Sequence, residues 1–161
     1  MVLSANWEER IRGAELLLRM GERAHTAEEA ILSVYRDDEG GSEAEVSVFR
    51  KLAAEVLGLV ADPKPATVAL LVDELDSLNG GVPDVASAAL QRIGHPAVKP
   101  LIAVLSGESG AAIYKAVVIL GKLGREAAEA LPRLEGLTQY PNADIRAAAA
   151  RAVQAIRAAG K

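Results

Sequence analysis

The side chains that most often carry catalysis or bind metal ions are sparse in this sequence, which has two histidines and no cysteine. The lack of cysteine excludes disulfides, thiolate zinc sites and cysteine nucleophiles. His25 and His95 lie about 70 residues apart, each at a turn between expected helices, and neither belongs to an acidic motif with metal-ligand spacing. We therefore expect no catalytic role and no metal site at either histidine.

The glycine-rich segments also lack the residues that their chemistry would need. Residues 107–110 read Gly-Glu-Ser-Gly, which resembles a nucleophile elbow but lacks the strand that must precede one. The pairs at 40–41 and 80–81 lack the Lys and Ser or Thr of a phosphate-binding loop. The segment at 107–110 is more typical of a tight turn between helices. The sequence thus predicts a protein that is not an enzyme and needs no cofactor.

The rest of the chain repeats one apolar pattern five times. Each copy ends in a hydrophobic anchor, with an aliphatic residue three positions earlier and a small residue seven positions earlier. The anchors are Met20, Val60, Ile93, Leu123 and Ile156; the aliphatic residues are Leu17, Leu57, Leu90, Leu120 and Val153; the small residues are Gly13, Ala53, Ala86, Ala116 and Ala149. These offsets fall on one face of a helix, so each copy predicts a helix that lets a neighbour approach closely at its small residue.

A second apolar segment precedes each of the last four copies. Helix-start signals include the capping-box spacings of Thr26 with Glu29 and of Ser42 with Glu45, and prolines at 65 and 96. We expect a glycine or alanine to end each helix at 21, 61, 94 and 124. The predicted helical pairs span 26–60, 64–93, 95–124 and 125–158, after a capping helix at about 6–20.

The fold prediction is therefore all-α, with about nine helices and no strand. Half of the residues are hydrophobic and 3% are aromatic, which favours a core of Ala, Leu, Val and Ile between closely stacked helices. We expect a single domain over 1–161, built as an α-solenoid of stacked antiparallel hairpins.

The anchors are spaced 40, 33, 30 and 33 residues apart, as in several families of helical repeats. The ankyrin and tetratricopeptide signatures are missing. The repeated pattern instead resembles the short HEAT-like repeats of bacterial proteins and is similar to the repeats of the phycobilisome-lyase group. Residues 95–105, 129–137 and 142–156 carry the resemblance, with sequences HPAVKPLIAVL, EALPRLEGL and NADIRAAAARAVQAI. It covers 64–158 well, and 1–60 only through the anchor offsets.

The resemblance implies that partners bind along the second helix of each pair. The candidate partner-binding residues, which point away from the anchor face, are Arg92, Tyr114, Lys122 and Arg151. We therefore predict a non-enzymatic scaffold or adaptor for protein–protein interaction. Two alternatives stay open: a HEAT-like protein that binds nucleic acid, and an accessory subunit of a cofactor-modifying enzyme.

The charges are distributed unevenly along the chain. Residues 1–80 carry 8 Lys and Arg against 16 Asp and Glu, and residues 81–161 carry 10 against 6, so the two halves have net charges of −8 and +4. This asymmetry favours a protein partner with an acidic surface. Nucleic acid is not expected, because +4 is a small charge and the carboxyl half has few aromatic residues for stacking.

The two ends of the sequence give further expectations. The first residues lack a signal-peptide pattern, and no apolar run approaches the ~20 residues of a membrane span, which favours a cytoplasmic protein without a membrane segment. Trp7 is expected to pack over the amino-terminal end, with an exposed binding anchor as the alternative. Exposed alanines at 147–150, 152 and 155 predict contact with another copy, or a larger array, through the carboxyl-terminal helix.

Overall fold

The structure is a computed structural model that describes residues 2–37 and 39–160, except for the side chains of residues 22, 24 and 25. Throughout these residues the regular elements are α-helices and short 3-10 helices, without a strand. Contacts divide the chain into two compact units, Met1–Ile93 and Gly94–Lys161. The all-α prediction is confirmed.

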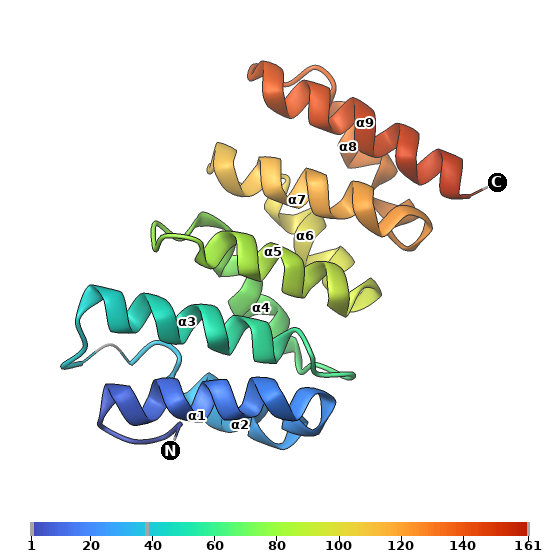
Figure 1. Cartoon of the computed structure of the whole chain (residues 1–161). Coiled ribbons are helices and arrows are strands. Elements are labelled where there is room, and N and C mark those ends of the chain that lie inside the picture. Colours follow the sequence, from blue (N-terminus) through green and yellow to red (C-terminus); the bar gives the residue numbers. More distant parts are fainter. Residues whose placement is uncertain (1, 38, 161) are drawn as a thin grey trace. The chain divides into compact units, whose positions relative to one another are not determined.

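The first unit packs its helices in two layers. Its elements are α1 (Trp7–Met20), a 3-10 helix (Gly21–Ala27), α2 (Glu28–Val34), α3 (Glu43–Leu57), α4 (Pro65–Asp73), a second 3-10 helix (Glu74–Asp76) and α5 (Val82–Ile93). Helices α1, α3 and α5 lie side by side in one layer, and α2 and α4 lie behind them in Figure 1.

The second unit repeats this arrangement. Its elements are a 3-10 helix (His95–Ala97), α6 (Val98–Val104), α7 (Gly110–Leu123), a 3-10 helix (Gly124–Ala130), α8 (Leu131–Leu137) and α9 (Ala143–Ala159). Helix α7 packs along α9, and α6 and α8 form the layer behind them (Figure 1). Within the described residues, the nine α-helices confirm the prediction of four helical pairs after a leading helix.

The small and aliphatic rows of the repeat form the core. All five small residues are buried, and the four alanines among them are fully inaccessible. Three of the aliphatic residues are also inaccessible, Val153 is buried and Leu17 is half-buried. Among the anchors Val60 and Ile156 are buried, Ile93 and Leu123 are half-buried, and Met20 has 44% of its surface exposed. It lies on α1, whose neighbour in the same layer, among the described residues, is α3.

Of the two predicted capping boxes, Ser42 with Glu45 is confirmed and Thr26 with Glu29 is wrong. The Asn6 side chain accepts a hydrogen bond from the Glu9 N–H at 3.2 Å, and Ser42 with Glu45 forms a complete capping box at the start of α3. The Thr26–Glu29 capping box does not form. A 3-10 helix runs directly into α2, so Thr26 lies within a helical turn, and the Glu29 carboxylate pairs with Lys64 instead.

Three of the four predicted helix ends are confirmed and one is wrong. Gly21, Gly94 and Gly124 end α1, α5 and α7 with φ of 59°, 75° and 57°, a left-handed conformation that favours glycine. The prediction is wrong for α3, which ends at Leu57 with Gly58 as its cap rather than running to Val60. Val60 remains buried because a hydrogen-bonded turn carries its backbone back to Leu57.

The alanine-rich surface predicted on the last helix is only partly exposed. Alanines 148, 149 and 152 are buried in the second unit, whereas those at 147, 150 and 155 are exposed. The prediction treated the whole run as uncovered, but α7 and α8 pack against two sides of α9.

Candidate interaction surface between helices α7 and α9

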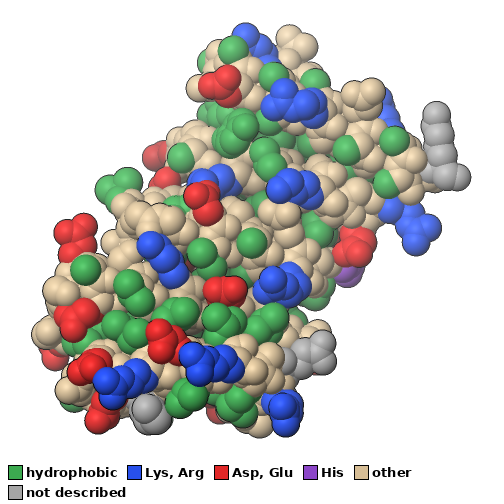
Figure 2. Space-filling view, viewed as in Figure 1, with side chains coloured by type: hydrophobic (Ala, Val, Ile, Leu, Met, Phe, Trp, Pro, Cys, Tyr) green, Lys and Arg blue, Asp and Glu red, His purple; other side chains and the backbone are tan. Residues whose placement is uncertain are grey.

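The layer formed by α7 and α9 is strongly biased toward positive charge. The two helices carry five Lys and Arg residues and a single acidic residue, Asp144. On this face of the second unit, Figure 2 shows green apolar surface bordered by blue Lys and Arg side chains. Lys122, Arg151 and Arg157 are exposed on these helices, whereas Lys115 and Arg146 are half-buried.

Three of the five cations, Lys115, Arg146 and Arg157, already interact with other groups of the chain. Arg146 donates hydrogen bonds to the carbonyl oxygens of Tyr140 and Pro141, both at 2.7 Å. Arg157 forms an ion pair with Glu135 at 2.6 Å. By contrast, Lys122 and Arg151 are exposed and form no ion pair with any residue that the structure describes.

Lys122 and Arg151 line the same groove between α7 and α9. Its volume is about 200 Å³, and nearly all of its surface is apolar. The other residues that line it are Val117, Val118, Gly121, Ala148, Ala152 and Ala155. One cation comes from each helix, so the apolar groove has a positive rim.

The groove exists because the two helices meet through their smallest residues. A side chain on Gly121 would place its Cβ 2.9 Å from Ala152 Cβ and 3.0 Å from Ala152 Cα. The backbones therefore approach closely at this point, and no large side chain fills the surface above it.

Tyr114 lies at a second hollow between the same helices. This hollow has a volume of about 330 Å³ and is lined by Gly110, Ala111, Tyr114, Asn142, Asp144 and Ile145. Tyr114 is 38% exposed. The structure thus brings Tyr114, Lys122 and Arg151 to one interhelical surface. Arg92 belongs to the first unit, where it is exposed in the last turn of α5.

Sequence reasoning missed the apolar floor between the predicted cations. The signal was present as a glycine two positions before one anchor and an alanine four positions before the next. Gly121 and Ala152 have these offsets, and so do Gly58 and Ala89 in the first unit, where a Cβ on the glycine would lie 2.7 Å from Ala89 Cβ. This paired offset marks both close contacts.

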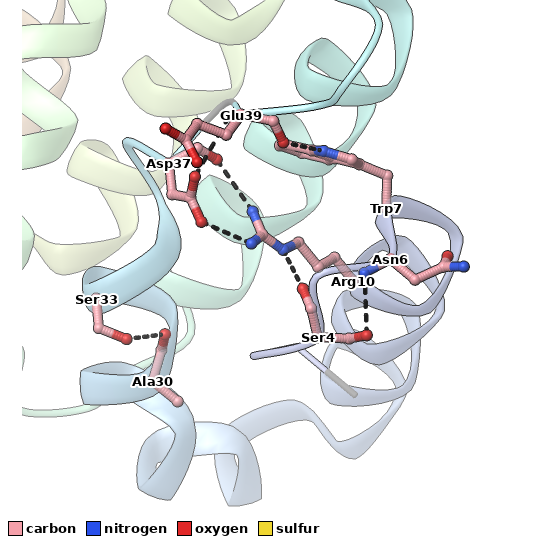
Figure 3. A network of polar contacts seen from close by, with 8 residues as sticks. All are labelled: Ser4, Asn6, Trp7, Arg10, Ala30, Ser33, Asp37 and Glu39. Carbon is pink, nitrogen blue, oxygen red and sulfur yellow. Dashed lines mark hydrogen bonds and ion pairs between the residues drawn. The ribbon is translucent and has the colours of Figure 1, made fainter.

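Trp7, the aromatic candidate for a binding anchor, is a core residue. It is 5% exposed and meets the Phe49 ring edge-on at 5.9 Å between centroids. Its indole Nε1 donates a hydrogen bond to the Glu39 carbonyl oxygen at 3.0 Å (Figure 3). The prediction that Trp7 is packed is confirmed, although its contacts lie with α3 and the loop before it.

Arg10 joins Trp7 to the same loop (Figure 3). Its guanidinium lies 4.8 Å from the centre of the Trp7 ring and donates to the Asp37 carboxylate at 2.6 Å and the Asp37 carbonyl at 3.1 Å. It also donates to the Ser4 carbonyl. The hydrogen bond from Arg10, followed by that from the Glu39 N–H, lowers the pKa of Asp37. This network fixes the amino-terminal segment and the α2–α3 loop.

The carboxylate of the buried residue Glu28 accepts two hydrogen bonds through its Oε1 atom. It accepts hydrogen bonds from the Lys64 backbone N–H at 2.8 Å and from the Thr67 hydroxyl. The residue that precedes α4 makes no side-chain cap of its own. Glu28 therefore caps α4 from another helix, where a negative charge is favoured by the helix dipole.

The remaining chemical candidates are Ser109, His95 and His25. Ser109, in the elbow-like turn, caps α7 by accepting a hydrogen bond from the Ala112 N–H at 3.2 Å. His95 is exposed in a 3-10 turn, and the side chain of His25 lies outside the described residues. Across the described residues no group of three or more His, Asp and Glu side chains is placed to hold a metal ion. No helix within them is both long and apolar enough to span a bilayer.

Comparisons with known proteins agree with this architecture. A designed armadillo repeat protein in complex with a (KR)4 peptide matches with a TM-score of 0.55 and 18% identity, over 96% of this chain and 79% of that one. An engineered protein matches with a TM-score of 0.44 and 17% identity, over 98% and 94% of the two chains. The first likeness concerns the fold alone. No curated protein matches the chain.

The family comparison is more specific than these structural likenesses. The profile of the family described as HEAT repeats matches residues 68–154, which is more than half of the chain. The comparisons name no lyase, so the likeness to the phycobilisome-lyase group stays a prediction. The match, the paired helices and the α-solenoid class of fold agree, and the chain belongs to the HEAT repeat family.

Proposed function

We propose that this chain is a non-enzymatic protein-interaction module whose partner presents an acidic surface. The observation that carries the proposal is the pair Lys122 and Arg151, which are exposed, free of internal ion pairs among the described residues, and placed on two helices that border one apolar groove. Charges that a fold does not use internally remain available to a partner.

Simple electrostatics supports an acidic partner. Two hydrated cations add little affinity while they face water, but they attract carboxylates and speed up association at low salt. Tyr114 adds an exposed aromatic side chain on the same layer, and Tyr and Arg are enriched among residues that dominate binding energy. We assign Tyr114, Lys122 and Arg151 to this surface and Arg92 to a second contact in the first unit.

The fold class is consistent with this role. Helical repeats of the HEAT and armadillo type are typical of interaction scaffolds, and the designed armadillo protein is bound to a basic peptide. The layer of α7 and α9 in this chain is itself basic, so a peptide on it would need the opposite charge. No observation favours nucleic acid or a cofactor-modifying enzyme over a protein partner.

Affinity capture from lysate with the tagged full chain tests the proposal. The test variant changes Arg92, Lys122 and Arg151 to Glu, and the matched control changes Lys99, Arg125 and Arg133, which are also exposed, to Glu. Both variants alter the net charge equally and should keep the helical circular dichroism signal at 222 nm.

We expect the wild type and the matched control to enrich the same acidic protein, and the test variant to lose it. Added salt should reduce capture, because exposed ion pairs are screened. Capture that is equal for all three proteins would refute the proposed surface. A labelled duplex that shifts in a salt-dependent manner, without any captured protein, would favour the nucleic-acid alternative.

A further inference from the structure

The shape of the α7–α9 groove limits what can occupy it. At about 200 Å³ it is smaller than the roughly 300–1,000 Å³ of typical small-molecule sites. An apolar cavity of about 150 Å³ is nevertheless large enough for benzene. The groove therefore has room for one apolar side chain rather than for a whole metabolite.

The lining of the groove defines the kind of side chain. Val117, Ala148 and Ala152 are buried and form its floor with Gly121, whereas Val118 is half-buried and Ala155 is exposed at its wall. These groups offer no polar side-chain atom. An aliphatic side chain that covers them would leave no buried hydrogen-bonding group without a partner.

The rim defines what must flank that side chain. Lys122 follows Gly121 directly on α7, and Arg151 precedes Ala152 directly on α9. A ligand that places an apolar group over the Gly121–Ala152 contact therefore meets a cation from each helix. Carboxylates on both sides of the apolar group match this pattern, and charged hydrogen bonds to Arg and Lys are the strong ones.

We propose that the groove binds a linear acidic peptide segment, with one Leu- or Val-sized side chain seated on Gly121 and Ala152 and carboxylates flanking it toward Lys122 and Arg151. This inference rests on the proposed function and makes it more specific. The proposed function needs only an acidic partner, whereas the groove requires an aliphatic residue between the acidic ones.

A synthetic pentapeptide tests this pattern directly. The probe is acetylated and amidated Glu-Glu-Leu-Glu-Glu, titrated into the 15N-labelled full chain and followed by amide chemical shifts. Two comparison peptides replace the central Leu with Ser, or the four Glu residues with Lys. We expect shifts at Val118, Gly121 and Ala155 with the probe, and affinity about tenfold lower for each comparison peptide.

A filled groove provides the reciprocal test. Ala155→Leu adds an apolar side chain at an exposed position in the wall of the groove. We expect this variant to bind the probe about tenfold more weakly than the wild type does. The matched control Ala150→Leu lies on the same helix at an exposed position that lines a different hollow, and we expect unchanged affinity. Amide spectra show whether each variant keeps the wild-type packing.

The outcomes separate the two proposals. The groove inference is overturned if the Ser peptide binds as well as the Leu peptide, if the probe causes no shifts along α7 and α9, or if Ala155→Leu binds it normally. Should a captured partner still depend on Lys122 and Arg151 in any of those cases, the proposed function stands without the groove. If the partner is captured equally after Arg92, Lys122 and Arg151 are changed to Glu, the proposed function itself is refuted.

Discussion

The close contact between α7 and α9 makes a specific prediction for two glycines of the second unit. Gly121 lies in α7 against Ala152, and Gly136 lies in α8 with no atom within 4 Å of a built Cβ. Both are helical, so Gly→Ala gives each helix a similar gain of about 0.5–1 kcal/mol in the free energy of unfolding. Only Gly121→Ala also creates a clash.

The size of that clash follows from the distances. The new Cβ would lie 2.9 Å from Ala152 Cβ, whereas ordinary contacts begin near 3.4 Å, so the helices must separate by at least about 0.5 Å. Overpacking of this kind costs about 1–3 kcal/mol. We expect Gly136→Ala to stabilise the chain and Gly121→Ala to destabilise it by about 1 kcal/mol net.

Urea unfolding followed by circular dichroism at 222 nm provides the measurement. With a slope of about 2 kcal/mol per molar urea, a change of about 1 kcal/mol moves the midpoint by roughly 0.5 M. The two substitutions should move it in opposite directions. If Gly121→Ala stabilises the chain as much as Gly136→Ala does, the helices do not meet at this point and the reasoning for the groove floor is wrong.

Three further predictions concern the rest of the chain. Glu28→Ala leaves the Thr67 hydroxyl and the backbone N–H of Lys64, just before α4, without their acceptor and should cost about 2 kcal/mol in urea unfolding. Arg10 lowers the pKa of Asp37 below its ordinary value of 3.8, so that carboxylate stabilises the fold above about pH 4 and the contribution is lost as the pH falls through the lowered pKa. Asp37→Asn should therefore be less stable than wild type at pH 7, and the difference should shrink as the pH falls through the lowered pKa of Asp37. If residues 1–161 form a single domain, as the sequence predicts, limited proteolysis should release no stable fragment that begins or ends near residue 94.

The rows that set the core could be predicted because they depend on helix periodicity alone. Residues seven and three positions before an anchor share one face of a helix whatever the tertiary context, and the small row at Ala53, Ala86, Ala116 and Ala149 is fully buried. The family could be predicted for a similar reason. The resemblance began at residue 64, and the HEAT profile matches from residue 68.

Features that depend on distant residues could not be predicted in the same way. Glu28 and Glu29 look like a solvated helix start, but their partners Lys64 and Thr67 lie 35 to 39 residues away. The end of α3 also depends on tertiary packing, since Gly58 lies against Ala89 of α5.

The candidate site was predicted in part. Exposed cations at helical spacing identified Lys122 and Arg151, but the apolar floor between them requires knowing where α7 and α9 meet. Gly121 and Ala152 have the same offsets from their anchors as Gly58 and Ala89, which are in contact in the first unit. Both contacts must be known before this spacing can be recognised as a sign of close helix packing. Similar short repeats can be searched for this spacing.

We propose above all that an acidic partner binds the cationic layer of α7 and α9. The most direct test compares the affinity of the captured partner for the wild type with its affinity for the double variant Lys122→Glu, Arg151→Glu. We expect the double variant to bind at least about tenfold more weakly and with a shallower dependence on salt. Equal affinity and equal salt dependence for the two proteins would contradict the claim.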